Sequence, residues 1–152
     1  MTRYASHTTV APEKSRAEIE RVIRRYGATA FAYMGGPQGA AVAFQVNTRQ
    51  VRFMLPLPDP KDKIFLPKRA RTGRSRESAI VAAYELAIRQ RWRALALCIK
   101  AKLEAVAAGI VTFDEEFLAH LVLPGGKTMG EEYIPQLEGH FSGKSLPPLL
   151  GM

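Results

Sequence analysis

The sequence predicts an α+β fold: a three-stranded antiparallel meander packed by an N-terminal helix and a long central helix, with two short C-terminal helices. Two observations predict it. Apolar residues alternate with small or polar ones over much of 28–57, the period of a half-buried strand. Between 81 and 106 they recur every three or four residues, the period of a helix. The chain has 152 residues, 47% of them hydrophobic, which is enough for one core.

The first helix is expected from Ser15 to about Tyr26. The tetrapeptide SRAE at 15–18 has the pattern of a capping box, and Gly27 supplies a stop. The apolar residues at 19, 22, 23 and 26 fall on one face of this helix. Residues 1–13 lack periodicity, and we expect them to form a flexible N-terminus.

The meander is expected over residues 28–57, with a glycine-rich loop at 35–39 and a turn near Asn47. The alternation predicts one apolar face and one polar face. The apolar face comprises Val42, Phe44, Val46, Val51, Phe53 and Leu55, and the polar face Gln45, Asn47, Gln50 and Arg52. We expect Tyr33 to belong to the core, although an outward ring would offer a base a stacking surface.

The long helix is expected from about Ser75 to Ala108, and Gly109 ends it. Its apolar stripe consists of Val81, Tyr84, Ile88, Trp92, Leu95, Ile99, Leu103 and Val106. Any part of this stripe that the core leaves uncovered would let two copies associate through the long helix.

Capping-box patterns at 112–115 and 128–131 predict two short helices, the second bent or restarted by Pro135. Residues 14–144 are therefore expected to form a single domain, which includes a basic loop at 61–76. Residues 145–152, with two prolines, are expected to form an extended tail.

Positive charge is concentrated in the middle of the chain. Residues 61–102 hold 12 Lys and Arg against 3 Asp and Glu, whereas residues 103–152 hold 2 against 7. This asymmetry favours an anionic polymer as partner, although pairing with the acidic third of the same chain is the alternative. The expected nucleic-acid-binding residues are Arg52, Lys68, Arg69, Arg71, Arg74, Arg76, Arg89, Arg93 and Lys100.

The candidate catalytic and metal-ligating residues do not form a recognisable motif, so the sequence favours a binding protein over an enzyme. Cys98 is the one cysteine, which fits a reducing cytoplasm and is expected to pack as a small hydrophobe. Glu116 and His120 share a helix face, which suits either two metal ligands or an ordinary surface pair. Gly126-Lys127-Thr128 resembles the end of a phosphate-binding loop, but Leu121 occupies the position where that loop needs glycine. No metal or cofactor is therefore predicted, and no apolar run is long enough to span a membrane.

Five segments carry a resemblance: KSRAEIERVIRRYGA, NTRQVRFMLPLPD, RQRWRALALCIKAKLEAV, FDEEFLAHLVLPGGKT and PPLL. Together they look like a family of proteins of unknown function that bacteriophages and prophages encode. The resemblance implies a bacterial host cytoplasm and brings no catalytic residue with it. Two functions fit that setting: an accessory protein that binds nucleic acid, DNA being favoured, with low sequence specificity, or an inhibitor or adaptor that binds a host protein complex such as a defence system.

Overall fold

The computed structural model describes residues 5, 7–36, 39–70 and 72–150, and it has the α+β architecture that the sequence predicts. Three strands form one antiparallel sheet in the order β1-β2-β3. The elements are α1 Pro12–Arg25, β1 Ala28–Gly36, β2 Gly39–Val46, β3 Arg49–Pro56, η1 Lys63–Phe65, α2 Gly73–Ala107, α3 Phe113–Phe117, η2 Leu118–His120, α4 Met129–Tyr133, η3 Ile134–Gln136 and α5 Leu137–Phe141.

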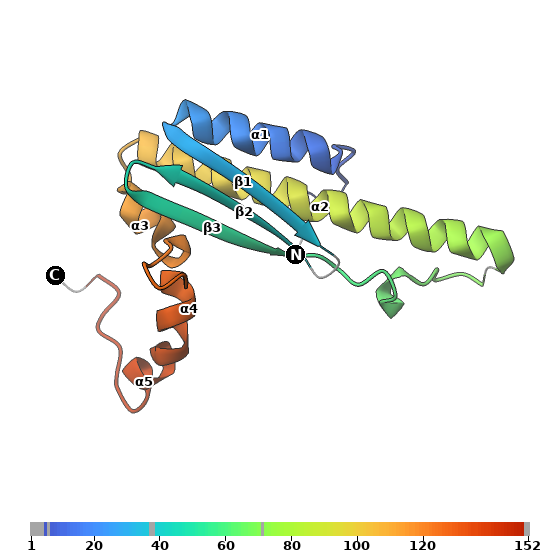
Figure 1. Ribbon diagram of the computed structural model, residues 1–152. Helices are drawn as coiled ribbons and strands as arrows, with labels where there is room; N and C mark the ends of the chain where they lie inside the picture. Colours follow the sequence, from blue (N-terminus) through green and yellow to red (C-terminus); the bar gives the residue numbers. More distant parts are fainter. Residues whose placement is uncertain (1–4, 6, 37–38, 71, 151–152) are drawn as a thin grey trace.

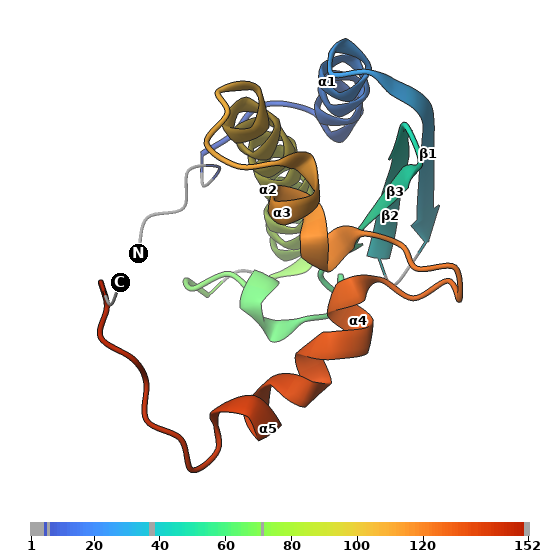
Figure 2. The same ribbon diagram turned by 90° about the vertical axis from the view of Figure 1, so that its left-hand side faces the viewer.

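Two layers enclose the core, because α1 and α2 both lie against the same face of the sheet (Figure 1, Figure 2). The covered face carries Val42, Phe44, Val51, Phe53 and Leu55, all buried, as the alternation predicts. Register places Tyr33, Val42 and Phe53 in one row across the three strands. Tyr33 therefore belongs to the covered face, but it sits on an edge strand and its side chain stays 45% exposed.

Helix α1 begins three residues earlier than the capping-box pattern indicates. Pro12 occupies its first turn, where a missing N–H costs nothing, and Ala11 precedes it without a side-chain cap. Ser15 is fully buried inside the helix, and Glu18 forms an ion pair with Arg93 of α2. The predicted capping box is therefore wrong, because Ser15 and Glu18 face α2 inside the helix and do not cap its start.

Helix α2 is the long helix of the prediction, with 35 residues and a length of about 50 Å. Its later turns pack into the core through Trp92, Leu95, Ile99 and Leu103, as the stripe predicts. Its first turns extend past the sheet and α1 (Figure 1), and there Val81 is 54% exposed. The apolar stripe is therefore covered by the core along the later turns of α2 and left uncovered near the start of the helix.

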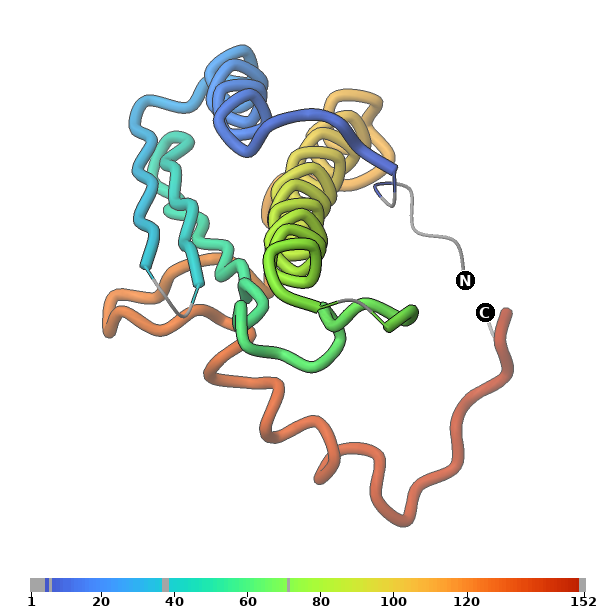
Figure 3. The backbone as a smooth tube through the Cα atoms, turned by 90° about the vertical axis from the view of Figure 1, so that its right-hand side faces the viewer, coloured from blue at the N-terminus to red at the C-terminus, as the bar shows by residue number. Residues whose placement is uncertain are grey.

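Both C-terminal capping boxes are present. Glu115 N donates to Thr112 Oγ1 at 3.3 Å and Thr112 N donates to Glu115 Oε2 at 2.7 Å; Thr128 and Glu131 bond in the same way. Residues 129–150, here called the C-terminal arm, lead away from the sheet (Figure 3). Pro135 lies in the 3₁₀ turn η3 between α4 and α5, where the sequence predicts a bend.

Candidate nucleic-acid interface

The first turns of α2 and the segment that leads into them form one basic projection, here called the basic end (residues 61–76). It carries exposed basic side chains from two elements. Those that the structure describes are Lys61, Lys63, Lys68, Arg69, Arg74 and Arg76. Arg71 belongs to the expected set but lies outside the described residues. The predicted loop is shorter than 61–76, because α2 already begins at Gly73 and holds Arg74 and Arg76 in its first turn.

Local contacts order the segment below α2. The Asp62 side chain accepts a hydrogen bond from Ile64 N at 3.1 Å, and the Asp59 side chain accepts one from Lys61 N at 2.8 Å. Phe65 is buried, and its ring stands edge-on to Tyr84 of α2 with the centroids 5.7 Å apart. The carboxylates of this segment therefore shape the backbone, and the aromatic pair holds the segment against the helix.

The basic end carries a large excess of positive charge, with Asp62 as the one acid between residues 61 and 76. Among the described residues, no ion pair includes a Lys or Arg of this region. The first turn of α2 contains no acid either, and its preceding residue, Thr72, does not cap it with its side chain. The positive end of the helix dipole and the free N–H groups of that turn therefore add to the side-chain charge.

Elsewhere the acidic third of the chain does pair with basic residues. Arg49 binds Asp114 through Nη2 at 2.9 Å, and Lys102 binds Glu116 at 2.9 Å. The bond holds the pKa of the Asp114 carboxyl below its ordinary value. Intramolecular pairing thus accounts for charge around the sheet and α3, and leaves the basic end without a partner.

Two of the expected binding residues are occupied within the molecule. Arg52 Nη2 donates to Gly126 O at 2.9 Å and to Glu131 Oε2 at 3.0 Å, which ties β3 to the start of α4. Arg93 pairs with Glu18 and joins α2 to α1, with both side chains largely buried. These two arginines hold elements together and lie apart from the basic end.

Two further expected residues lie along α2. Arg89 is half-buried, and its Nε is shielded with no hydrogen-bond partner in the described part of the chain. Lys100 is exposed, but 26 residues of helix separate it from Arg74, a distance of about 39 Å. The structure therefore brings Lys68, Arg69, Arg74 and Arg76 together and leaves the other members of the expected set elsewhere.

The candidate metal pair is engaged in other contacts. Glu116 binds Lys102, and the ring of His120 stacks on Phe53 with the centroids 4.0 Å apart. Burial, with a smaller contribution from Lys102, lowers the pKa of His120. Within the described ranges, no three His, Cys, Asp or Glu residues gather where they could hold a metal. Cys98 is exposed, so the expectation that it packs as a small hydrophobe is wrong.

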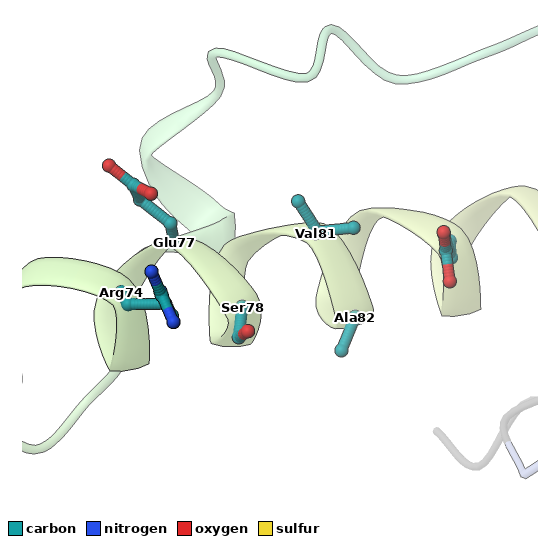
Figure 4. Close-up of a pocket in the computed structure, with 6 residues that line it drawn as sticks. Arg74, Glu77, Ser78, Val81 and Ala82 are labelled. Atoms are coloured by element: carbon teal, nitrogen blue, oxygen red, sulfur yellow. The ribbon is translucent and has the colours of Figure 1, made fainter.

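A shallow hollow lies along α2 beside the basic end. Figure 4 shows its lining residues, Arg74, Glu77, Ser78, Val81, Ala82 and Glu85, all of which come from this one helix. Both signs of charge line it, and a single helix surface cannot enclose a small molecule. The feature is a groove on the side of α2 and supplies no catalytic arrangement.

Similarity to known proteins does not suggest a function for the basic end. Comparison with known proteins found no matching family model, no matching curated protein and no matching solved structure. Among the described residues, no helix combines the length and apolar character that crossing a bilayer requires. Exposure, charge and position in this fold are therefore the observations from which a function is inferred.

Proposed function

We propose that this chain is a phage-encoded accessory protein that binds nucleic acid through its basic end. One observation carries the proposal: at least six exposed Lys and Arg side chains share a projection in which none has a described ion-pair partner. Like charges gathered at one end of a chain repel one another, and a bound anion relieves that repulsion.

A polymer of phosphates is the anion that suits this surface. Each phosphate that a Lys or Arg neutralises releases condensed counterions, so many weak contacts add up without a preformed pocket. Arginine also offers a planar fork of donors that matches phosphate oxygens. The basic end projects beyond the sheet (Figure 1), which suits a groove or a backbone better than it suits a small ligand.

Low sequence specificity and a preference for DNA are part of the proposal. The basic end offers flexible cations for phosphates, and within the described residues no recognition helix follows a tight turn in the helix-turn-helix manner. DNA is favoured because the resemblance to phage-encoded proteins places the chain where a phage genome replicates. The expected location is then the bacterial host cytoplasm.

The test compares two variants of equal charge. In the first, Lys68, Arg69, Arg74 and Arg76 all become Ala; in the second, Lys14, Arg21, Arg25 and Lys144 become Ala. All eight side chains are exposed and have no described ion pair, so both variants lose four charges without losing a described salt bridge. Affinity is measured by fluorescence polarisation with labelled single- and double-stranded DNA and RNA.

The basic-end variant should bind at least about a hundredfold more weakly than the wild type at low salt, because it loses four phosphate contacts. The control variant should lose much less. Equal losses in both variants would mean that net charge alone drives binding, and absent binding by the wild type would remove the proposal. In the latter case, the alternative of a host protein complex would be tested in nuclease-treated lysate.

A further inference from the structure

The outer face of the sheet, which α1 and α2 do not cover, carries Ala30, Gln45 and Gln50 in its first row and becomes apolar toward its other end. Register places Ala32, Ala43 and Arg52 in one row, and Met34, Ala41 and Met54 in the next. An antiparallel sheet that faces water ordinarily carries polar side chains on its free face. Here Met34 is 70% and Met54 61% exposed, and no labelled helix lies over this face of the sheet (Figure 1, Figure 2).

The same face contains a hollow of about 220 Å³. Its lining combines Ala30, Ala32 and Ala43 with larger residues, among them Gln45, Arg52 and Val122. A cavity of about 150 Å³ is enough to hold a benzene ring, so this hollow has room for one aromatic side chain.

The C-terminal arm carries the opposite feature, a row of large apolar side chains without cover. Tyr133, Leu137 and Phe141 lie four residues apart along α4, η3 and α5. All three are about half exposed or more, and every residue from 133 to 150 is exposed. A free-standing apolar row of this kind marks a docking surface.

The base of the arm is fixed in a direction that leads away from its own sheet. Thr128 and Glu131 cap α4, and Arg52 holds Glu131 at 3.0 Å. A Cβ at Gly130 would come within 2.8 Å of Ala119 O, so α4 approaches η2 as closely as glycine permits. Figure 2 shows α5 on the side of the sheet opposite to the outer face. In the described structure the arm therefore leads away from the outer face of its own sheet.

We propose that two copies of this chain exchange their C-terminal arms, each arm covering the outer face of the other copy's sheet. Large side chains on the arm meet small ones on the sheet, and the hollow accommodates the ring of Phe141. Reciprocal exchange forms a closed two-fold dimer, the commonest symmetry of soluble oligomers.

Charge also favours this occupant. Of the three Glu of the arm, Glu131 and Glu132 already pair with Arg52 and Lys127, and Glu138 has no described ion pair, whereas the rest of the chain is strongly positive. Arg52 lines the hollow, and in the described structure its Nη2 has acceptors while its Nη1 has none. Glu138 precedes Phe141 by one helical turn, so an arriving arm brings a carboxylate to the neighbourhood of that guanidinium.

The test places one cysteine on each surface, in full-length protein with Cys98 changed to Ser. One variant carries Ala43→Cys, and the other carries Phe141→Cys. After mixing and mild oxidation, arm exchange should join the two chains by a disulfide between these positions, identified by mass spectrometry of the linked peptides. A mixture of Ala43→Cys with Lys14→Cys, on the exposed side of α1, should cross-link at least tenfold less.

A second measurement guards against a cysteine that disturbs the fold. Light scattering should show a dimer for the wild type, and Met54→Glu should convert it to a monomer with an unchanged circular dichroism spectrum. A monomeric wild type would overturn the proposal. So would a dimer that resists Met54→Glu and dissociates with Val81→Glu, since that result would place the contact on α2. A further variant carries both Ala43→Cys and Phe141→Cys. An intrachain disulfide in it, without interchain product, would show that the arm folds onto its own sheet and would overturn the proposal.

Discussion

The basic side chains of this protein fall into two groups that differ in their surroundings rather than in their chemistry. Arg93 and Arg52 are held by Glu18 and Glu131 and connect elements of the fold. Arg74 and Arg76 are exposed at the first turn of α2 and have no described ion pair. The first group should therefore contribute to stability and the second to binding.

Replacement of Arg93 by Ala tests this division. The change leaves the Glu18 carboxylate, whose side chain is only 20% exposed, without its partner. The free energy of unfolding in urea should fall by about 1–2 kcal/mol, while nucleic-acid affinity at fixed salt should change little. Arg25→Ala, which removes an exposed charge without a described ion pair, is the matched control. A loss of affinity as large as that of Arg74→Ala would contradict the division.

His120 should make stability depend on pH. Burial lowers its pKa below the ordinary value of 6.5, so protonation costs more in the folded chain than in the unfolded one. Its contribution to the free energy of unfolding is complete above about pH 6.5. That contribution is lost as the pH falls through the lowered pKa, where the folded chain also takes up the proton.

The variant His120→Phe keeps a ring against Phe53 and removes the titration, so its stability should vary less between pH 6.5 and 5 than that of the wild type. Urea unfolding at several pH values measures the difference. The control, His140→Gln, removes an exposed histidine of the arm. A wild-type slope that persists in His120→Phe would show that another group causes it.

Among the elements, the helices and strands with strong periodicity could be predicted from the sequence. Val42, Phe44, Val51 and Phe53 alternate because one face of the sheet is buried, and the structure confirms that face. The two capping boxes in the last third of the chain could also be predicted, because a Thr and a Glu three residues apart form both hydrogen bonds of the box between themselves. These features depend on near neighbours in the chain, which is why sequence patterns reveal them.

The features that the sequence did not reveal depend on distant partners. Ser15 and Glu18 match a capping box, but the Glu18 carboxylate binds Arg93, which lies 75 residues away in the sequence. Arg52 and Arg93 look as available as Arg74 in the sequence, since composition does not show which charge has a partner. Gln45, Gln50 and Arg52 lie on the outer face as predicted, but its apolar part was missed, because alanines alternate with larger residues in β1 and β2 and a small side chain suits either face of a sheet.

Phe65 is the residue that fixes the basic segment to α2, and its replacement by Ala should release that segment. Trypsin should then cut within residues 61–76 at least about tenfold faster, since loss of a buried ring costs more than 1.4 kcal/mol. The global melting temperature should change little, because Phe65 lies outside the main core cluster. Ile64→Ala, which removes a side chain that is 73% exposed, is the control. Equal cleavage of both variants would mean that the Phe65–Tyr84 contact does not order the segment.

At the scale of the whole molecule, charge and apolar surface are segregated. The basic end lies at one extremity, where α2 extends beyond the sheet. The C-terminal arm, which carries both acidic and exposed apolar residues, leaves from the opposite extremity (Figure 1). The core between them is an ordinary two-layer packing with a hydrophobic cluster from α1, α2 and the sheet. The body thus holds two exposed surfaces apart, one suited to phosphates and one suited to a second copy of the chain.

Arm exchange would give a dimer two basic ends, and each would keep its own access to a polymer. Two linked sites on one strand raise the overall affinity through effective concentration without any new contact. Binding should therefore weaken when Met54→Glu disrupts the dimer, even though Met54 lies far from the basic end. A monomeric variant with wild-type affinity for long DNA would show that the two surfaces act independently.

The central claim is that the basic end neutralises phosphates, and the salt dependence of binding tests it most directly. The measurement is the observed association constant for DNA at a series of salt concentrations. For four to six neutralised phosphates per copy, a plot of log Kobs against log salt should have a slope of about −4 to −5. The variant without Lys68, Arg69, Arg74 and Arg76 should have a slope near −1 or bind too weakly to measure. A slope near zero in the wild type, or binding absent at low salt, would contradict the account.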